Sequence, residues 1–172
     1  IYSKGGVDVV ATPFEATAPL GLQPELAHDP RVQRLLPAKD IATVEAASAQ
    51  RPSSEEIDEI RGSMGDYTDL VRAGANVSAG TDAPLTTPGI HNHLVLRAFV
   101  EGGMTEVEAL QTATSVAAET MGVAEDLGTL EVGKIADMVF VDGDPLMNIN
   151  DLVNIEAVMK GGTYITQEQI LD

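Results

Sequence analysis

The sequence contains no cysteine and no tryptophan among its 172 residues. The lack of cysteine excludes a disulfide-stabilised scaffold, a zinc site built on thiolates and a thiol nucleophile. Hydrophobic residues make up 44% of the chain and charged residues 22%, which is the balance of a globular protein and not that of a disordered acidic tail. We therefore expect a folded protein with a core of its own.

Basic residues are scarce, because 10 Lys and Arg stand against 27 Asp and Glu and give a formal net charge of −17. A surface of this sign repels phosphate backbones, which argues against nucleic-acid partners. Long apolar runs are missing too, since no stretch approaches the roughly 18 residues of a membrane span, and the opening residues Ile1–Gly6 have no apolar signal region. We expect no nucleic-acid partner, no membrane span and no export signal in this chain, and we favour a cytoplasmic location.

The first half of the chain has the pattern of a strand, a helix and a second strand. The β-branched run Gly6–Pro13 is typical of a strand buried on both faces of a parallel sheet. Ser53 and Glu56 form a capping-box pattern, and apolar residues at helical spacing then continue to Gly74. The small residues of Ala75–Thr81 predict a second buried strand, which completes a βαβ unit and indicates an α/β fold.

The segment between the first strand and this helix, Phe14–Arg51, is interrupted by prolines at positions 19, 24, 30 and 37. Such punctuation predicts an irregular excursion over the surface without a long element. His28 lies within the excursion and is expected to be exposed.

The second half of the chain predicts two helices and then several short strands. One helix is expected over His91–Glu101, and a second begins at the capping pair Thr105 and Glu108 and continues to Gly122. The short β runs that follow are Leu127–Gly133, Ala136–Val141 and Ile155–Ile165, the last with a two-residue hairpin signal at Gly161 and Gly162. A small β module therefore follows an α/β module.

Asp82 comes directly after the second predicted strand and is the first candidate for function. The carboxyl ends of parallel strands form the edge where α/β folds gather ligands and catalytic groups. The alternative is that Asp82 only orders the following turn, as Asp often does in loops. Position in the sequence does not decide between the two interpretations.

His91 and His93 look at first like a pair of metal ligands. Residues two apart lie on the same side of a strand but about 200° apart on a helix, and the residues that follow favour a helix. We therefore do not expect a shared metal. One of the two histidines is predicted to face the strand ends beside Asp82, as a substrate-contacting or loop-ordering group; the alternative is an exposed histidine at the start of a helix.

The sequence has no glycine-rich dinucleotide fingerprint, no phosphate-binding loop and no Gly-x-Ser-x-Gly element, so these three classes of site have no support.

Three segments, taken together, resemble the carboxyl-terminal part of the metal-dependent amidohydrolase superfamily. They are Gly74–Pro84 (GANVSAGTDAP), Gly103–Thr114 (GMTEVEALQTAT) and Leu127–Leu146 (LGTLEVGKIADMVFVDGDPL), in the order of the family. The nearest branch is similar to the imidazolonepropionase-like and prolidase-like enzymes. The run Gly6–Pro13 resembles the seventh barrel strand of these enzymes, although less specifically.

The resemblance implies a fold and an activity. Residues 6–13 and 75–81 would be strands seven and eight of a (β/α)₈ TIM barrel, with residues 1–122 forming the barrel portion. Residues 123–172 would form part of the small β-sandwich that the family builds from both chain ends. Asp82 would ligate a divalent metal, in most cases zinc, and would act as proton acceptor and donor while a metal-activated hydroxide attacks an amide, lactam or dipeptide C–N bond.

The other metal ligands of the family have no counterpart in this chain, and position 93 carries a histidine where the branch often shows a glutamate. A complete barrel takes about 250 residues. We therefore expect a fragment that needs the remaining N-terminal barrel portion or a partner chain, and a homo-oligomer once complete. The competing hypothesis is a non-catalytic structural or assembly fragment, or a degenerate member used for binding; the isolated chain is expected to be inactive.

Overall fold

The computed structural model describes residues 6–13, 24–82 and 89–171. Its elements are β1 (Val9–Ala11), η2 (Pro24–His28), α2 (Pro30–Leu35), α3 (Ala38–Ser48), α4 (Ser54–Arg72), β2 (Val77–Ala79), α5 (Ile90–Glu101), α6 (Glu106–Thr112), α7 (Ser115–Thr120), β3 (Met138–Val141), η3 (Ile149–Val153), β4 (Ile155–Lys160), β5 (Thr163–Thr166) and α8 (Gln167–Leu171). The mixture of helices with parallel and antiparallel strands fits the α/β class that the sequence predicts.

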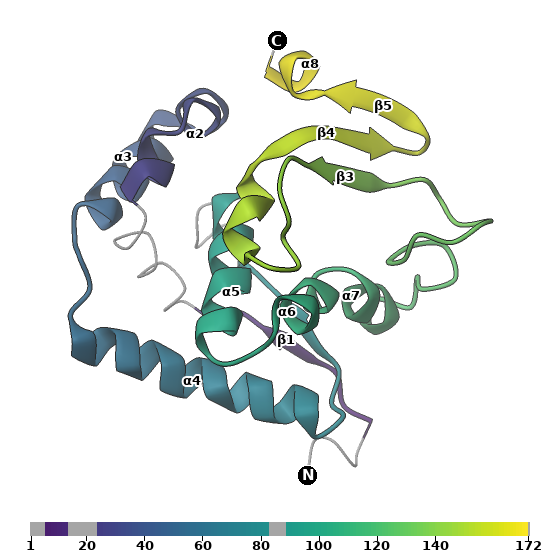
Figure 1. Ribbon diagram of the computed structural model, residues 1–172, viewed down its shortest axis with the longest axis horizontal. Helices are drawn as coiled ribbons and strands as arrows, with labels where there is room; N and C mark the ends of the chain where they lie inside the picture. Colours follow the sequence, from purple (N-terminus) through teal and green to yellow (C-terminus); the bar gives the residue numbers. More distant parts are fainter. Residues whose placement is uncertain (1–5, 14–23, 83–88, 172) are drawn as a thin grey trace.

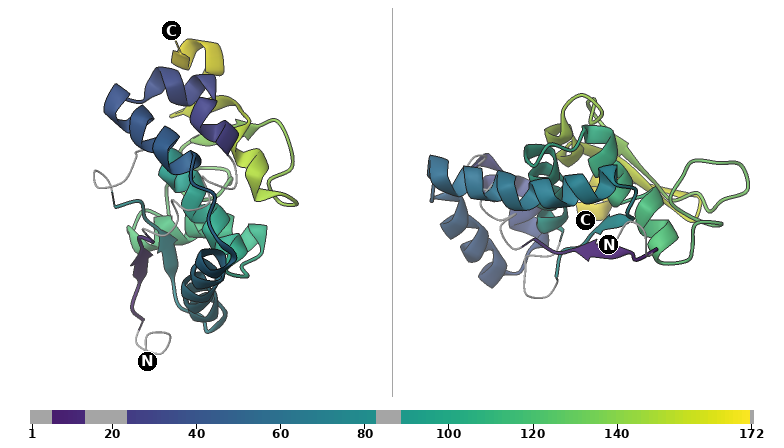
Figure 2. Two further views of the ribbon diagram at one scale, coloured as in Figure 1. Left: turned by 90° about the vertical axis from the view of Figure 1, so that its left-hand side faces the viewer. Right: turned by 90° about the horizontal axis from the view of Figure 1, so that it is seen from below.

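The two strands of the predicted βαβ unit lie side by side. β1 pairs with β2 in parallel, with Val9 opposite Val77 and Ala11 opposite Ala79, as the left view of Figure 2 shows. Ala11 and Val77 are both 1% exposed, whereas Val10 of β1 is 58% exposed. The expectation that the first strand is buried on both faces is therefore wrong, because the described residues cover only one face of β1 at this point. Parallel strands place their carboxyl ends at one edge, so the chain leaves β1 and β2 at neighbouring points.

α4 begins as the capping box predicts. The Ser53 hydroxyl accepts from the Glu56 backbone N–H at 3.2 Å, and the Glu56 carboxylate accepts from the Ser53 backbone N–H at 2.7 Å. These reciprocal bonds satisfy donors that a helix start otherwise leaves unpaired. The first turn is fixed by local sequence alone.

α5 is the central helix and lies between α4 and the three-stranded sheet (Figure 1). Most of its residues are buried, among them Leu94, Val95 and Phe99. The ring of Phe99 meets Tyr67 of α4 edge-on, with centroids 5.8 Å apart. The core of the molecule is therefore built around this helix.

The excursion between β1 and α4 is mostly helical, which corrects the irregular path predicted from its prolines. η2, α2 and α3 occupy much of it, and Pro24, Pro30 and Pro37 stand at the first residue of η2, at the first residue of α2 and at the N-cap of α3. Proline fits the start of a helix, where its missing N–H would have had no partner. His28 is exposed, as expected, and Pro19 lies outside the described residues.

The helix predicted from Thr105 to Gly122 is divided into α6 and α7. Its capping box and its end at Gly122, where φ is +71°, agree with the prediction. The break falls at Ala113 and Thr114, and the Thr114 hydroxyl donates to the Leu110 carbonyl at 2.8 Å. Hydroxyl groups that bond to helix carbonyls in this way bend helices.

The run Leu127–Gly133, predicted to be a strand, is instead a series of turns. Gly128 and Gly133 adopt φ values of +93° and +101°, which strands do not use. The Lys134 ammonium donates to the Ala124 carbonyl at 2.7 Å and so ties the turns together. The apolar residues of this run do not all face a core, because Leu130 is 78% exposed.

β3, β4 and β5 form an antiparallel sheet in that order. The hairpin between β4 and β5 turns at Gly161 and Gly162, both with positive φ, as the sequence predicts. Phe140 of β3 and Tyr164 of β5 meet edge-on across the sheet at 5.3 Å. The strand predicted at Ala136–Val141 is confirmed as β3.

None of the described helices combines the length and the apolar character needed to cross a lipid bilayer.

Candidate functional site

Asp82 lies just beyond the carboxyl end of β2, as the strand pattern predicts. The Gly80 backbone N–H donates to the Ala11 carbonyl at 2.7 Å, so the pairing with β1 continues one residue past β2. The chain then turns at Asp82, whose φ is +52°; among the described residues it is the one non-glycine residue with a positive φ. Asp tolerates this left-handed conformation better than most residues. The side chain is partly exposed at the strand-end edge.

His91 lies in the first turn of α5 and faces the end of β1. It is 1% exposed, and within the described part of the chain neither ring nitrogen makes a hydrogen bond of normal geometry. Burial lowers the pKa of His91, and the nearby Pro13 carbonyl opposes this effect only in part. His91 is therefore a neutral, buried group at the strand-end edge, and the exposed alternative considered for it is wrong.

His93 points to a different part of the molecule, toward the β module. Its Nδ1 is buried and has no hydrogen bond to any described residue. Burial, with the positive charges of Arg97 and Arg31, lowers the pKa of His93 to about 4. The ring is therefore neutral at neutral pH.

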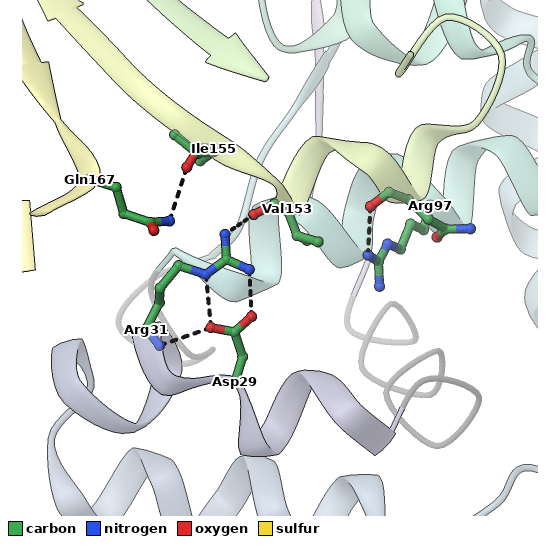
Figure 3. A network of polar contacts seen from close by, with 7 residues as sticks. Asp29, Arg31, Arg97, Val153, Ile155 and Gln167 are labelled. Atoms are coloured by element: carbon green, nitrogen blue, oxygen red, sulfur yellow. Dashed lines mark hydrogen bonds and ion pairs between the residues drawn. The ribbon is translucent and has the colours of Figure 1, made fainter. Parts of the chain in front are cut away.

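The arginines near His93 belong to a network that joins the excursion to the β module (Figure 3). Arg31 forms an ion pair with Asp29, and its guanidinium also donates to the Val153 carbonyl. Arg97, which is 5% exposed, donates to the Asn150 carbonyl at 3.5 Å, and burial lowers its pKa to about 10. These contacts attach α2 and α5 to η3.

Sequence reasoning did not single out Arg97 or Arg31. The available signal was Arg97 itself, a lone charge within the apolar run Leu94–Phe99. A charge in such a run is buried only when it has partners. The partners lie far along the chain, so the sequence alone does not identify them.

The two histidines do not lie in one site. His91 lies at the end of β1 and His93 among the arginines, so the two rings face different parts of the fold. Within residues 6–13, 24–82 and 89–171, no group of three or more His, Asp or Glu side chains could hold a metal ion. The described residues therefore do not fit a complete metal site, and Asp82 is the one strand-end carboxylate that could contribute a ligand.

A wide groove of about 890 Å³ separates α5, α6 and α7 from β3 and β4. Apolar side chains make most of its lining, and His93, Asp137 and Lys160 supply polar atoms. Asp82 and His91 are not part of it. The groove therefore lies apart from the strand-end edge and has the character of an uncovered packing surface.

Comparison with known proteins identifies a family and several relatives of this chain. The amidohydrolase family matches residues 32–165. Imidazolonepropionase from Geobacillus kaustophilus is 36% identical over 104 residues, which is 58% of this chain and 24% of that protein. Ochratoxinase from Aspergillus niger is 37% identical over 101 residues, or 56% of this chain and 20% of that protein.

The fold has solved counterparts as well. The crystal structure of a prolidase complexed with N-methylphosphonate-L-proline superposes with a TM-score of 0.53 at 25% identity, and covers 95% of this chain and 36% of that one. The chain spans about a quarter of the length of the curated relatives that it matches.

Proposed function

The chain belongs to the amidohydrolase family, with similarities to imidazolonepropionases and prolidases, and from this premise we propose that the complete protein hydrolyses a C–N bond of the amide, lactam or dipeptide type. The observation that carries the proposal is the position of Asp82. It stands at the carboxyl end of a parallel strand, held in an unusual backbone conformation, at the edge where α/β folds place catalytic groups.

β1 and β2 are proposed to be strands seven and eight of a (β/α)₈ barrel. Residues 1–122 would belong to the barrel and residues 123–172 to a small β-sandwich. The sheet β1–β2 has only two strands among the described residues, and Val10 of β1 is 58% exposed. Open edges and an exposed strand face of this kind support further strands being supplied by the rest of the protein.

Members of the family generally use divalent metal ions. Because the described residues offer one candidate ligand, Asp82, and no group of three, we derive no step through a metal. The remaining ligands would be residues of the rest of the barrel. Zinc is the ion that we expect them to bind.

Asp82 is proposed to move the proton in the reaction. Its carboxylate accepts a proton from the water that attacks the carbonyl carbon, and a tetrahedral intermediate forms. The protonated carboxyl then donates that proton to the leaving nitrogen as the C–N bond breaks, so that a carboxylic acid and an amine are released. Asp82 ends the cycle as a carboxylate again.

The substrate class is proposed to be small and to contain an amide-type bond. The names of the relatives suggest two probes, imidazolonepropionate and a dipeptide that ends in proline, such as Ala-Pro. His91 is proposed to order the loop at the end of β1, because it is buried against Pro13. His93 is proposed to have no contact with substrate, because it faces the β module.

The test is a comparison of Asp82→Asn with a matched control, Asp66→Asn, which changes an aspartate on α4 away from the strand-end edge. Asn also tolerates positive φ, so the first variant removes the proton acceptor and keeps the backbone. We expect turnover of Ala-Pro or imidazolonepropionate to fall about 10²- to 10⁴-fold in Asp82→Asn, and to stay unchanged in Asp66→Asn.

The competing proposal is a non-catalytic structural or assembly role. It is favoured by the single candidate catalytic group in the described part of the chain. Under that proposal the complete protein turns over none of the probes. If turnover exists but Asp82→Asn keeps more than about a tenth of it, the hydrolase proposal survives and the role of Asp82 does not.

A further inference from the structure

We propose that Gly80 is a positioning residue that fixes where Asp82 leaves the sheet. The proposal rests on the proposed catalytic role of Asp82 and adds a second residue to the site. It is carried by the close approach of the end of β2 to β1 at Gly80, two residues before Asp82.

The space beside Gly80 admits no side chain. A Cβ built on this residue would lie 2.8 Å from Val10 Cγ1, 2.8 Å from Thr12 Cγ2 and 3.1 Å from the Ala11 carbonyl oxygen. Non-bonded carbon atoms prefer a separation of about 3.5–4.0 Å. A larger residue at this position would therefore displace the side chains of Val10 and Thr12 or the strand end itself.

The neighbours have little freedom to move aside by rotation of their side chains alone. Val10 and Thr12 are β-branched, and their χ1 angles are restricted. The carbonyl of Ala11 belongs to the backbone and already accepts the Gly80 N–H at 2.7 Å. An added Cβ would therefore push the end of β2 away from β1 and lengthen this hydrogen bond.

Asp82 would move with the displaced strand end. Its backbone turns at a φ of +52° directly after the close contact, so the direction of the carboxylate depends on where the turn begins. A misplacement of about 1 Å in a catalytic group can cost about 10² in rate. Gly80 thus acts through Asp82 and has no contact with substrate.

The test is a double-mutant cycle of Gly80→Ala and Asp82→Asn in the complete protein. The measurement is kcat and KM on Ala-Pro or imidazolonepropionate, whichever the wild type turns over faster. We expect Gly80→Ala to lower kcat about 10- to 100-fold with little change in KM. In the Asp82→Asn background the same substitution should change kcat less than about twofold, because no catalytic carboxylate remains to be displaced.

A rescue variant separates positioning from loss of folding. Val10→Ala with Thr12→Ser removes both γ-carbons that the new Cβ would strike, and should restore most of the kcat of Gly80→Ala. If Gly80→Ala does not fold, the cycle is run in a Thr12→Ser background, which removes one of the two clashing γ-carbons and keeps the clash with Val10, and the same non-additivity is expected.

An equal loss of kcat from Gly80→Ala in the presence and in the absence of the Asp82→Asn substitution would show a structural role only, and would overturn the proposal. Wild-type kcat in Gly80→Ala would also overturn it. A silent Asp82→Asn variant, in contrast, refutes the proposed catalytic role of Asp82 itself, so the two failures are distinguishable.

Discussion

Gly102, the C-cap of α5, packs directly against the backbone of α4, and its replacement by alanine should be strongly destabilising. A Cβ built on Gly102 would lie 2.3 Å from Met64 Cβ, 2.7 Å from the Met64 carbonyl carbon and 3.0 Å from the Gly65 nitrogen. The atoms that it strikes are backbone atoms or a Cβ, so no change of rotamer removes the clash. The two helices must separate by about 1 Å to reach ordinary contact distances.

Separation would disturb an interface that is well packed. Met64 is 1% exposed, and the Thr68 hydroxyl donates to the Gly102 carbonyl at 2.9 Å across the same contact. Overpacking costs about 1–3 kcal/mol when side chains can adjust. Because backbone must move here, we expect Gly102→Ala to lower the free energy of unfolding by about 3 kcal/mol.

Gly62 provides the matched control. It lies on the exposed side of α4, and a Cβ there would meet no atom within 4 Å. Alanine is favoured over glycine inside a helix by about 0.5–1 kcal/mol, so Gly62→Ala should be stabilising. Both variants are measured by urea unfolding of the purified protein. A Gly102→Ala variant within about 0.5 kcal/mol of the wild type would refute the packing of α4 against α5 at this point.

Two further predictions concern the network beside the β module. The pKa of His93 is about 4 in the folded protein, against an ordinary 6.5, so the unfolded chain takes up a proton first as the pH falls. Between pH 6.5 and pH 4 the free energy of unfolding of the wild type should therefore fall by up to about 3 kcal/mol more than that of His93→Gln. The same pH dependence of thermal unfolding in both proteins would contradict this. Arg31→Met should cost about 1–3 kcal/mol because Asp29, whose side chain is 17% exposed, keeps its charge without its partner. Asp29→Asn added to Arg31→Met should recover part of that loss in the same urea assay, whereas Arg61→Met, which removes a more exposed ion pair, should stay within about 1 kcal/mol of wild type.

Elements whose ends are set by neighbouring residues were predictable from the sequence. The capping boxes at Ser53 and Thr105 and the glycine pair that turns the β4–β5 hairpin involve residues close together in the chain, so their physics is visible in the sequence. The parallel pairing of β1 with β2 also followed, because two strands joined through a helix favour that arrangement. These features needed no knowledge of the core.

Local reasoning failed for the segment between β1 and α4 and for the helix predicted from Thr105 to Gly122. Proline interrupts a helix but also begins one, and the prolines at 24, 30 and 37 begin helices here. The break between α6 and α7 depends on the backbone bond made by Thr114, which the apolar pattern does not reveal. Such choices depend on which carbonyl a side chain meets.

The candidate site was likewise predictable from the sequence only in part. The place of Asp82 at the end of β2 was predictable from strand order. The burial of His91 and the surroundings of His93 were not, because Pro13, Arg31 and the η3 carbonyls that complete them come from distant parts of the chain. The close contact at Gly80 depends on the side chains of β1 and likewise has no local signature.

The most direct test of the central claim is turnover of Ala-Pro or imidazolonepropionate by the complete protein carrying Asp82→Gly, with and without added formate. Glycine adopts the positive φ of this position without strain and leaves room for a small carboxylate. Turnover should collapse by about 10² or more, and formate should restore part of it by supplying the missing proton acceptor. An Asp82→Gly variant that keeps more than about a tenth of wild-type turnover without formate would contradict the account.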